Sequence, residues 1–371
     1  EAYDYSILHE TFNYGIGAQY MINKGNYITA DCYADHFSSS YCFFKDNKTY
    51  NGKAGEEQVR KRTRNHNLSI KGIFKLGNRH KLSVGTEYIV DVLKSQTDNI
   101  AKEDAYTLAL FAQDEIKLLR NLQALIGVRY IYHENFKNHA TPNVALMYKP
   151  GKFNFRASYA AGFRTPTLSE LYATDIAKKN DRLTIGNLDL KSEKNNYFSL
   201  SAEYVHERFS VSVNAFYNNI RDMIDYNTIA TGDKAMEQYG HKEVRQRDNI
   251  AEAKVHGINV SANAYLGAGF NLSGGYTHLN TQDVELEQPI DKSIKNAYNI
   301  NAQWAHSWKI YRLNINLNGR INSKRFSKSY GYAPEYQLWN LNTRHSFNLK
   351  SVIIEPCLLY TSDAADEARS V

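Results

Sequence analysis

The feature that most constrains this fold is the regular exchange of apolar and polar residues at every second position. Residues 197–205 place Phe, Leu, Ala and Tyr on one face and Ser and Glu on the other. Residues 313–318 alternate Leu and Ile with Asn in the same way. Side chains of a β-strand point alternately to two faces, so this period predicts amphipathic strands. A soluble β-sandwich shows the same period, so the alternation alone does not choose between classes of β-protein.

The lengths of the predicted connections favour one class. Short turns alternate with long polar stretches along the chain, which predicts about sixteen strands of roughly 9–15 residues. The predicted tight turns lie at 24–25, 77–78, 120–121, 150–151, 207–208, 267–268, 308–309 and 350–351. The predicted long loops lie at about 45–63, 94–104, 133–141, 165–195, 227–248, 281–296 and 324–335. Outer-membrane barrels have short turns on one side and longer loops on the other, and closure leaves no unpaired edge in lipid.

Composition agrees with a membrane-spanning sheet. The mean hydropathy is −0.56, and the run of about 20 apolar residues that a transmembrane helix requires is not found in the sequence. Aromatic residues make up 13% of the chain. Several lie near predicted strand ends, as in the aromatic girdles of membrane barrels: Tyr130, Tyr132, Trp304, Trp308 and Trp339. The net charge of +6 is mild and does not indicate nucleic-acid binding. We therefore predict an all-β fold, an antiparallel transmembrane β-barrel.

Five segments carry a recognisable pattern. Residues 162–172 read GFRTPTLSELY and residues 185–193 read IGNLDLKSE. Residues 110–115, 214–225 and 249–258 read LFAQDE, NAFYNNIRDMID and NIAEAKVHGI. In order and spacing these segments resemble those of TonB-dependent outer-membrane receptors of the siderophore and cobalamin type. The residues that match the family signature are Phe163, Arg164, Pro166, Leu168, Glu170, Leu171, Tyr172, Gly186, Asn187, Leu190 and Glu193. Ser192 stands where the family often has Pro, and Asn259 where Glu is common.

The resemblance implies a function and a wider architecture. Barrels of this family have about 22 strands and a filled lumen, so about 16 strands imply that residues 1–356 are a partial barrel with its plug domain absent from this chain. The family members are energy-coupled receptors that import a large scarce ligand, here a ferric siderophore or cobalamin. The implied location is the outer membrane of a Gram-negative bacterium. The implied partners are outer-membrane lipid, lipopolysaccharide and a TonB-type energy-transducing protein that acts through the missing plug.

The signature also has a local structural interpretation. Thr167 and Glu170 have the spacing of a capping box, which predicts a short helical turn. Pro166 lacks an N–H and suits a strand end, and Gly186 with Asn187 suits a turn that returns to the sheet. We expect these residues to serve mainly the architecture, with direct ligand contact as the smaller part.

Candidate ligand-contact residues lie in the predicted loops. Two basic clusters there attract an anionic ferric chelate or pair with lipopolysaccharide phosphates, and nearby aromatic rings stack on a ligand. These candidates are Arg60, Arg62, Arg64, Tyr226, Tyr239, His241, Arg245, Arg247, Tyr330 and Tyr332. Haem-uptake members carry a His between the two halves of the signature, and none lies between Arg164 and Gly186, so His241 alone keeps a haem receptor as an alternative.

The sequence leaves open several other classes of protein, and it raises a question about the C-terminal residues 357–371. No nucleophile elbow, phosphate loop or metal-ligand spacing occurs, so we expect a transporter without catalytic residues, metal or cofactor. A passive porin-like or structural barrel, an outer-membrane enzyme and a soluble β-protein remain alternatives. Residues 357–371 break the alternation and resemble the translation of a transposase sequencing adapter. We expect this tail to be non-native and poorly packed.

Overall fold

The computed structural model describes residues 4–48, 50–177, 181–328, 331–349 and 352–363. Its long strands in the first half are β1 (Tyr5–Asn23), β2 (Asn26–Phe43), β3 (Glu57–Leu76), β4 (His80–Ser95), β5 (Ile100–Leu119), β6 (Leu122–His133), β7 (Lys137–Tyr148) and β8 (Phe153–Arg164). Those in the second half are β11 (Glu193–Val205), β12 (Phe209–Thr231), β13 (Glu243–Gly267), β14 (Phe270–Asp283), β15 (Asn296–Ser307), β16 (Tyr311–Asn322) and β19 (Tyr336–Leu349). The short strands are β9 (Thr174–Ala177), β10 (Arg182–Ile185), β17 (Arg325–Ser327), β18 (Gly331–Ala333), β20 (Val352–Ile354) and β21 (Cys357–Asp363).

Two short helices lie in the connections, α1 (Leu168–Tyr172) and α2 (Gly232–Tyr239). In the described part of the chain, no helix has both the length and the apolar character needed to cross a bilayer.

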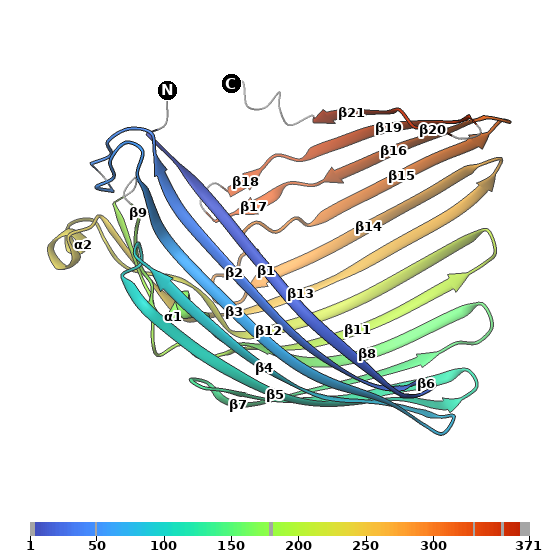
Figure 1. Cartoon of the computed structure of the whole chain (residues 1–371), viewed down its shortest axis with the longest axis horizontal. Helices are drawn as coiled ribbons and strands as arrows, with labels where there is room; N and C mark the ends of the chain where they lie inside the picture. The colour runs from blue at the N-terminus through green and yellow to red at the C-terminus, as the bar shows by residue number, and fades with distance from the viewer. Residues whose placement is uncertain (1–3, 49, 178–180, 329–330, 350–351, 364–371) are drawn as a thin grey trace.

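The long strands form one continuous antiparallel ladder. Each pairs with its neighbours in chain order, and β8 pairs directly with β11 across the inserted α1, β9 and β10. Figure 1 shows the resulting sheet curving as a wall whose strands run from the loop end to the turn end. Among the described residues β1 pairs with β2 alone, so the sheet does not close. The all-β, barrel-type prediction is confirmed. Fifteen of the described strands are long, and the two short strands β20 and β21 both pair with β19 in the place of a sixteenth.

The predicted tight turns are confirmed wherever the structure describes them. Strands β1 and β2 are joined at 24–25, β5 and β6 at 120–121, and β15 and β16 at 308–310. Gly25 has a φ of +99°, in the left-handed region that glycine adopts without strain. The eighth predicted turn, at 350–351, lies outside the described residues.

The predicted loops need correction. The connection between β4 and β5 shrinks to 96–99 and that between β6 and β7 to 134–136. Strands β12 and β13 reach 23 and 25 residues, well beyond the predicted length, and much of 227–248 is strand rather than loop. The physical reason is that backbone pairing continues past the alternating part of these strands: β12 and β13 stay paired out to Thr231 and Glu243, and β10 pairs with β13 over Glu243–Gln246. Polar residues there have no alternation and look like a loop in the sequence.

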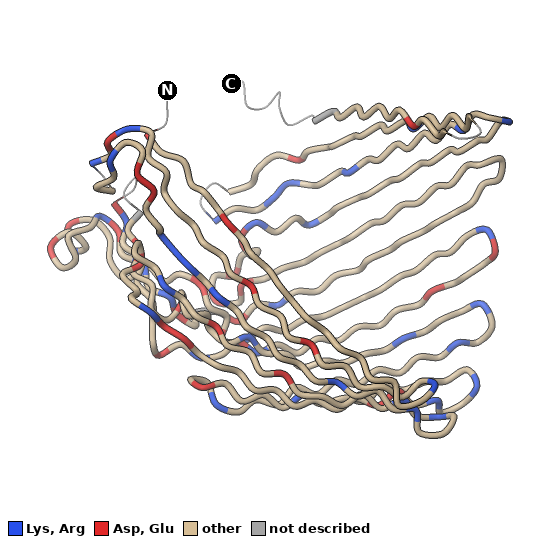
Figure 2. The backbone as a smooth tube through the Cα atoms, in the orientation of Figure 1, with Lys and Arg blue, Asp and Glu red and all other residues tan. Residues whose placement is uncertain are grey.

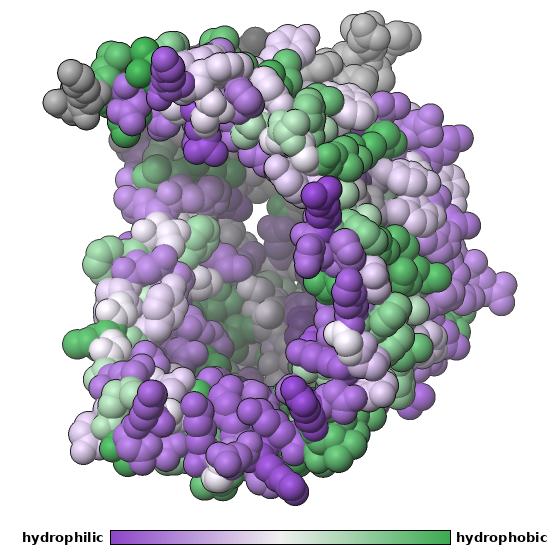
Figure 3. All heavy atoms as spheres, turned by 90° about the vertical axis from the view of Figure 1, so that its right-hand side faces the viewer, coloured by the Kyte–Doolittle hydropathy of each residue, from purple (hydrophilic) through white to green (hydrophobic). Residues whose placement is uncertain are grey.

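The two faces of the wall differ as the alternation predicts. Large apolar side chains such as Ile16, Leu110 and Leu200 are 78%, 52% and 63% exposed on the outer face. The inner face carries polar ladders, with Asn301 Nδ2 donating to Asn316 Oδ1 at 2.7 Å. Figure 2 shows charged residues gathered at the turns and toward the loops, with long uncharged stretches along β13 to β16. Viewed from the turn end, Figure 3 shows the wall curving around a hollow. An exposed apolar belt of this size suits lipid rather than water.

The tail differs in part from the expectation. Cys357–Asp363 forms strand β21, which pairs with β19, so these residues are not detached from the sheet. Leu358, Leu359 and Tyr360 are nevertheless 68%, 69% and 68% exposed. Any chain next to an open sheet edge can satisfy the edge's backbone groups, whatever its side chains.

Candidate ligand site at the loop end

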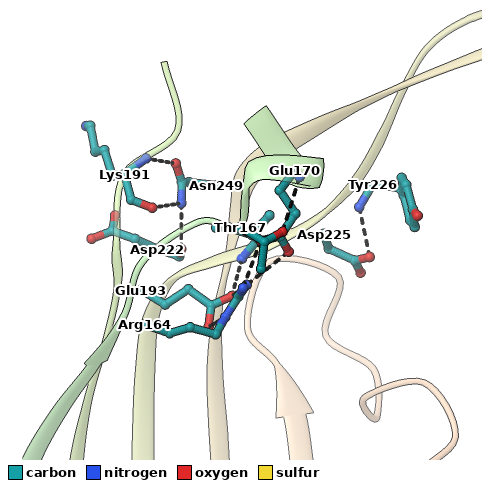
Figure 4. Close-up of polar contacts among 10 residues, drawn as sticks. Arg164, Thr167, Glu170, Lys191, Glu193, Asp222, Asp225, Tyr226 and Asn249 are labelled. Carbon is teal, nitrogen blue, oxygen red and sulfur yellow. Dashed lines mark hydrogen bonds and ion pairs between the residues drawn. The ribbon is translucent and has the colours of Figure 1, made fainter. Parts of the chain in front are cut away.

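The centre of the family signature is an arginine that joins two carboxylates. Arg164 ends β8, Glu193 begins β11, and Glu170 lies in α1. Arg164 Nε donates to Glu193 Oε2 and Nη1 to Glu170 Oε2, each at 2.8 Å. Nη2 donates to the second oxygen of each carboxylate, at 2.6 Å for Glu193 and 3.2 Å for Glu170. Figure 4 shows the guanidinium between the two acids, which fixes α1 over the ends of the two strands.

The predicted capping box is present at the start of α1. Glu170 N–H donates to Thr167 Oγ1 at 3.2 Å, and Thr167 N–H donates to Glu170 Oε2 at 2.8 Å. Burial raises the pKa of the Glu170 carboxyl, but hydrogen bonds from Arg164 and Thr167 outweigh burial and leave the pKa below its ordinary value. The short helix is therefore held by an ionised carboxylate.

The second half of the signature, residues 185–193, packs against helix α1. Gly186 N–H donates to Ala173 O at 2.7 Å, and an added Cβ at Gly186 would lie 2.5 Å from Leu171 O. Only glycine allows this approach of the two backbones. Asn187 Nδ2 then donates to Arg247 O at 2.9 Å, which ties the turn to β13.

An apolar cluster packs beside these hydrogen-bonded groups. Leu171 of α1, Leu190 and Ile224 of β12 are buried together, with Tyr172 and Phe136 packed against them. We call residues 165–192 the signature loop. The remaining signature residues support it: Pro166 is buried, Leu168 is half-buried, and Phe163 stacks on His139. The signature side chains that contact other parts of the protein itself are Phe163, Arg164, Glu170, Leu171, Tyr172, Asn187, Leu190 and Glu193.

Asn249 is a residue that the sequence analysis did not single out as a site residue. Its Oδ1 accepts from Lys191 N–H at 2.7 Å, and its Nδ2 donates to Lys191 O at 3.0 Å and Asp222 O at 2.6 Å. Asp222 has a φ of +56° and lies in a β-bulge of β12. The signal was present, because Asn249 opens one of the five family segments.

The predicted candidates Tyr226, Arg245 and Arg247 are brought together. Tyr226 pairs with Arg247 across β12 and β13, and Arg245 lies on the same face as Arg247. That face also carries Ile224, against which the signature loop packs. The Arg247 guanidinium lies 3.6 Å from the centre of the Tyr226 ring, and its Nη2 donates to the Tyr226 hydroxyl at 2.6 Å. Among the described residues Arg247 has no carboxylate partner, whereas Arg245 pairs with Glu243.

Other candidates lie nearby or apart. His241 follows α2, and its Nδ1 lies 2.9 Å from Asp181 Oδ1, a contact that lowers the pKa of Asp181. Tyr239 ends α2, and Tyr332 lies in β18, where it contacts Phe326. Tyr330 lies outside the described residues.

The predicted candidates Arg60, Arg62 and Arg64 do not join this site. Arg60, Arg62 and Arg64 belong to β3 rather than to a loop, which corrects the prediction. Arg60 lies 4.4 Å over the Tyr41 ring. The neighbouring Lys61 donates to Ser169 of α1 at 2.8 Å, so the alternation turns Arg62 and Arg64 to the opposite face, which also carries exposed Leu68 and Ile70. The face to which a side chain points is set by strand register. A prediction that places these residues in a loop therefore cannot give their direction.

A second ion cluster was not predicted. Lys328, in the connection between β17 and β18, lies 3.0 Å from Asp225 of β12 and 3.5 Å from Asp283 of β14. Burial lowers the pKa of Lys328, but the two carboxylates outweigh it and raise the pKa. No group of three or more His, Cys, Asp or Glu in the described ranges is arranged to hold a metal ion.

These features agree with a known class of membrane protein. The sequence matches the family described as "TonB dependent receptor-like, beta-barrel" over residues 2–354, and the chain belongs to that family. Among curated relatives, it is 25% identical over 179 residues to the ferrienterobactin receptor of Escherichia coli K12, covering 46% of this chain and 24% of the relative. It is 27% identical over 222 residues to hemoglobin-binding protein A of Haemophilus influenzae, covering 55% and 21%.

Solved structures show the same fold. A variant of the ferric enterobactin receptor of Pseudomonas aeruginosa superposes with a TM-score of 0.75 at 17% identity, covering 94% of this chain and 55% of that one. The FrpB iron transporter of Neisseria meningitidis gives a TM-score of 0.68 at 14% identity, covering 94% and 60%. At these identities the likeness shows the fold alone. The chain spans only about a fifth to a quarter of the two curated relatives' length.

Proposed function

We propose that this chain forms part of an energy-coupled receptor that takes up a ferric siderophore through the outer membrane of a Gram-negative bacterium. The observation that carries the proposal is the arrangement of Arg247 over Tyr226 beside the signature loop. It offers a cation without a carboxylate partner among the described residues, together with an aromatic face. Many ferric siderophores are anionic and carry aromatic or oxygen-rich donors. Family membership and the ferric enterobactin receptors among the relatives support the same ligand class.

The geometry suggests how the ligand is received. Guanidinium groups bind oxyanions through several N–H donors, and an aromatic ring adds stacking area. Arg247 is half-buried, which strengthens its attraction for an anion relative to a fully solvated side chain. The polar Asn and Ser ladders of the inner face offer hydrogen-bond partners farther along the wall. No bond chemistry is part of this proposal.

A haem or haemoglobin receptor is the second candidate. His241 favours it, because its Nδ1 is held by Asp181 and its Nε2 would then be the nitrogen left for iron. Several relatives are haemoglobin-binding proteins. A cobalamin receptor remains a prediction from the sequence resemblance, without a structural feature of its own.

The proposed partners follow from the same function. A plug domain within the barrel and a TonB-type protein of the energy-transducing complex would drive uptake, and outer-membrane lipid and lipopolysaccharide would surround the apolar belt. A passive porin would need neither a plug domain nor a TonB-type protein. Uptake that stops when a protonophore collapses the proton gradient supports the receptor, and uptake that continues contradicts it.

Binding to the full receptor chain in detergent tests the ligand. Radiolabelled ferric enterobactin, haemin and cyanocobalamin serve as probes, each with native protein and with Arg247→Gln and His241→Ala. The matched control is Arg79→Gln, in the turn between β3 and β4. We expect ferric enterobactin to bind and Arg247→Gln to weaken it about tenfold, with the control within twofold. Haemin binding that depends on His241 favours the second candidate, and tight binding of cyanocobalamin alone overturns both.

A further inference from the structure

The outer face of the first six strands is layered toward the loop end. One cross-strand row consists of apolar and aromatic residues paired in register from β1 to β6: Ile16, Cys32, Leu68, Tyr88, Leu108 and Tyr132. Ile16, Leu68 and Leu108 are 78%, 48% and 39% exposed. In a membrane barrel such a row faces acyl chains.

Aromatic rings form the next layer. Tyr14, His36 and His66 make successive edge-to-face contacts, at 5.8 and 5.4 Å between ring centres. Tyr106 contacts Tyr88 and Tyr132, each at 6.0 Å. Rings with one apolar and one polar side are typical of the boundary between acyl chains and headgroups. The boundary on this face therefore lies at these residues.

Cations begin at the level of these rings and continue one step toward the loops. Arg64 pairs with His36 across β2 and β3. Arg62 pairs with Lys94 across β3 and β4, two residues closer to the loops on the same face. All three cationic side chains are exposed, and within the described ranges none has an ion pair or hydrogen bond. The carboxylates on the same face are engaged, because Asp104 pairs with Lys102 at 2.8 Å and Glu10 accepts from Ser38 at 3.3 Å.

We infer that Arg62, Arg64 and Lys94 form a binding site for the phosphorylated headgroup of an outer-leaflet glycolipid, the lipid A part of lipopolysaccharide. The order of acyl belt, aromatic rings and cations matches the order of acyl chains, glucosamine backbone and phosphates in that lipid. This site lies on the face opposite to Lys61, which contacts α1 at 2.8 Å, so it is separate from the ligand site.

The spacing of the cations favours a headgroup with more than one phosphate. Neighbouring strands lie about 4.8 Å apart, and residues two apart in a strand lie about 6.8 Å apart. Arg62 and Lys94 can therefore share one phosphate, while Arg64 reaches a second anionic group of the same molecule. Guanidinium groups bind phosphate through paired N–H donors, and lysine adds a point charge.

Lipid binding to the full chain in detergent tests the site. The probes are diphosphorylated lipid A, chemically dephosphorylated lipid A and phosphatidylglycerol, with bound lipid measured by native mass spectrometry. The site variant is Arg62→Gln, Arg64→Gln and Lys94→Gln. The control removes three cations from short turns at the other end: Lys149→Gln, Lys152→Gln and Arg208→Gln. Retention of heat-modifiable gel mobility shows that each variant is folded.

We expect diphosphorylated lipid A to bind the site variant at least about tenfold more weakly than the native chain, with the control within twofold. Dephosphorylated lipid A should bind native chain and site variant alike. Equal losses in both variants, or native binding that does not depend on the phosphates, overturn the site. Phosphatidylglycerol that binds as tightly as lipid A and is lost in the same variant overturns the assignment to a multiply phosphorylated headgroup.

Discussion

Removing the Arg164 guanidinium should loosen the signature loop without unfolding the barrel. In Arg164→Gln, Glu170 and Glu193 lose their shared cation, although Glu170 keeps Thr167 and Glu193 keeps the Ile224 N–H at 2.8 Å. The arginine side chain is 42% exposed, so its bonds are screened by water. At about 0.5 kcal/mol for each of the four hydrogen bonds, the loss is about 2 kcal/mol.

Hydrogen exchange measures this loss directly. The reporters are the backbone N–H groups of Leu171, Gly186 and Asn187, which donate to carbonyls within the signature loop. A loss of about 2 kcal/mol predicts roughly 30-fold faster exchange through local opening. Amides of the β12–β13 ladder should keep their native protection, because those strands are held by backbone pairing on both sides.

Two further variants sharpen the result. Arg164→Lys keeps the charge but loses the paired N–H donors, so its exchange should fall between native and Arg164→Gln. Arg129→Gln removes an ion pair with Glu87 inside the strand ladder and should leave the reporters unchanged. Reporter exchange in Arg164→Gln that stays within threefold of native would refute the view that this cluster holds the loop.

The other predictions concern the same loop and the tail. Gly186→Ala should destabilise the loop by about 1–3 kcal/mol, seen as faster proteolysis, because its Cβ would meet Leu171 O at 2.5 Å. Asn249→Ala should speed exchange in the signature loop, because three hydrogen bonds are lost; unchanged exchange would contradict the role of this residue. The lowered pKa of Glu170 contributes stability that is present above its ordinary pKa of 4.5 and lost as pH falls through the lowered pKa, so loop protection should drop only in acid. Deletion of 357–371 should leave ligand binding and loop exchange unchanged, as expected of a non-native tail; a loss of either would show that the tail is part of the protein's working structure.

Much of the ladder was predictable because its signals are local. A turn such as 24–25 depends on residues next to each other, and Gly25 takes the left-handed conformation through its own lack of a side chain. The capping box at Thr167 is likewise contained in four residues. The lengths of β12 and β13 were not predictable from the sequence. At the loop end these strands are held by backbone pairing with each other, and their residues there do not alternate between apolar and polar.

The candidate site could be predicted only in part. The family segments pointed to Arg164, Glu170 and Glu193, but not to the way one guanidinium joins both acids. Lys328 is 103 residues from Asp225 in the chain, and no local pattern signals that contact.

The sequence by itself determined that this chain forms amphipathic strands joined by alternating short and long connections, and that it carries the family signature. Periodicity, turn chemistry and capping act between neighbours, so they can be recognised without coordinates. Tertiary structure alone decided which basic residues face which way. Arg62 and Arg64 belong to the outer face and Arg247 to the side of the signature loop, because strand register and bulges set the direction of each side chain.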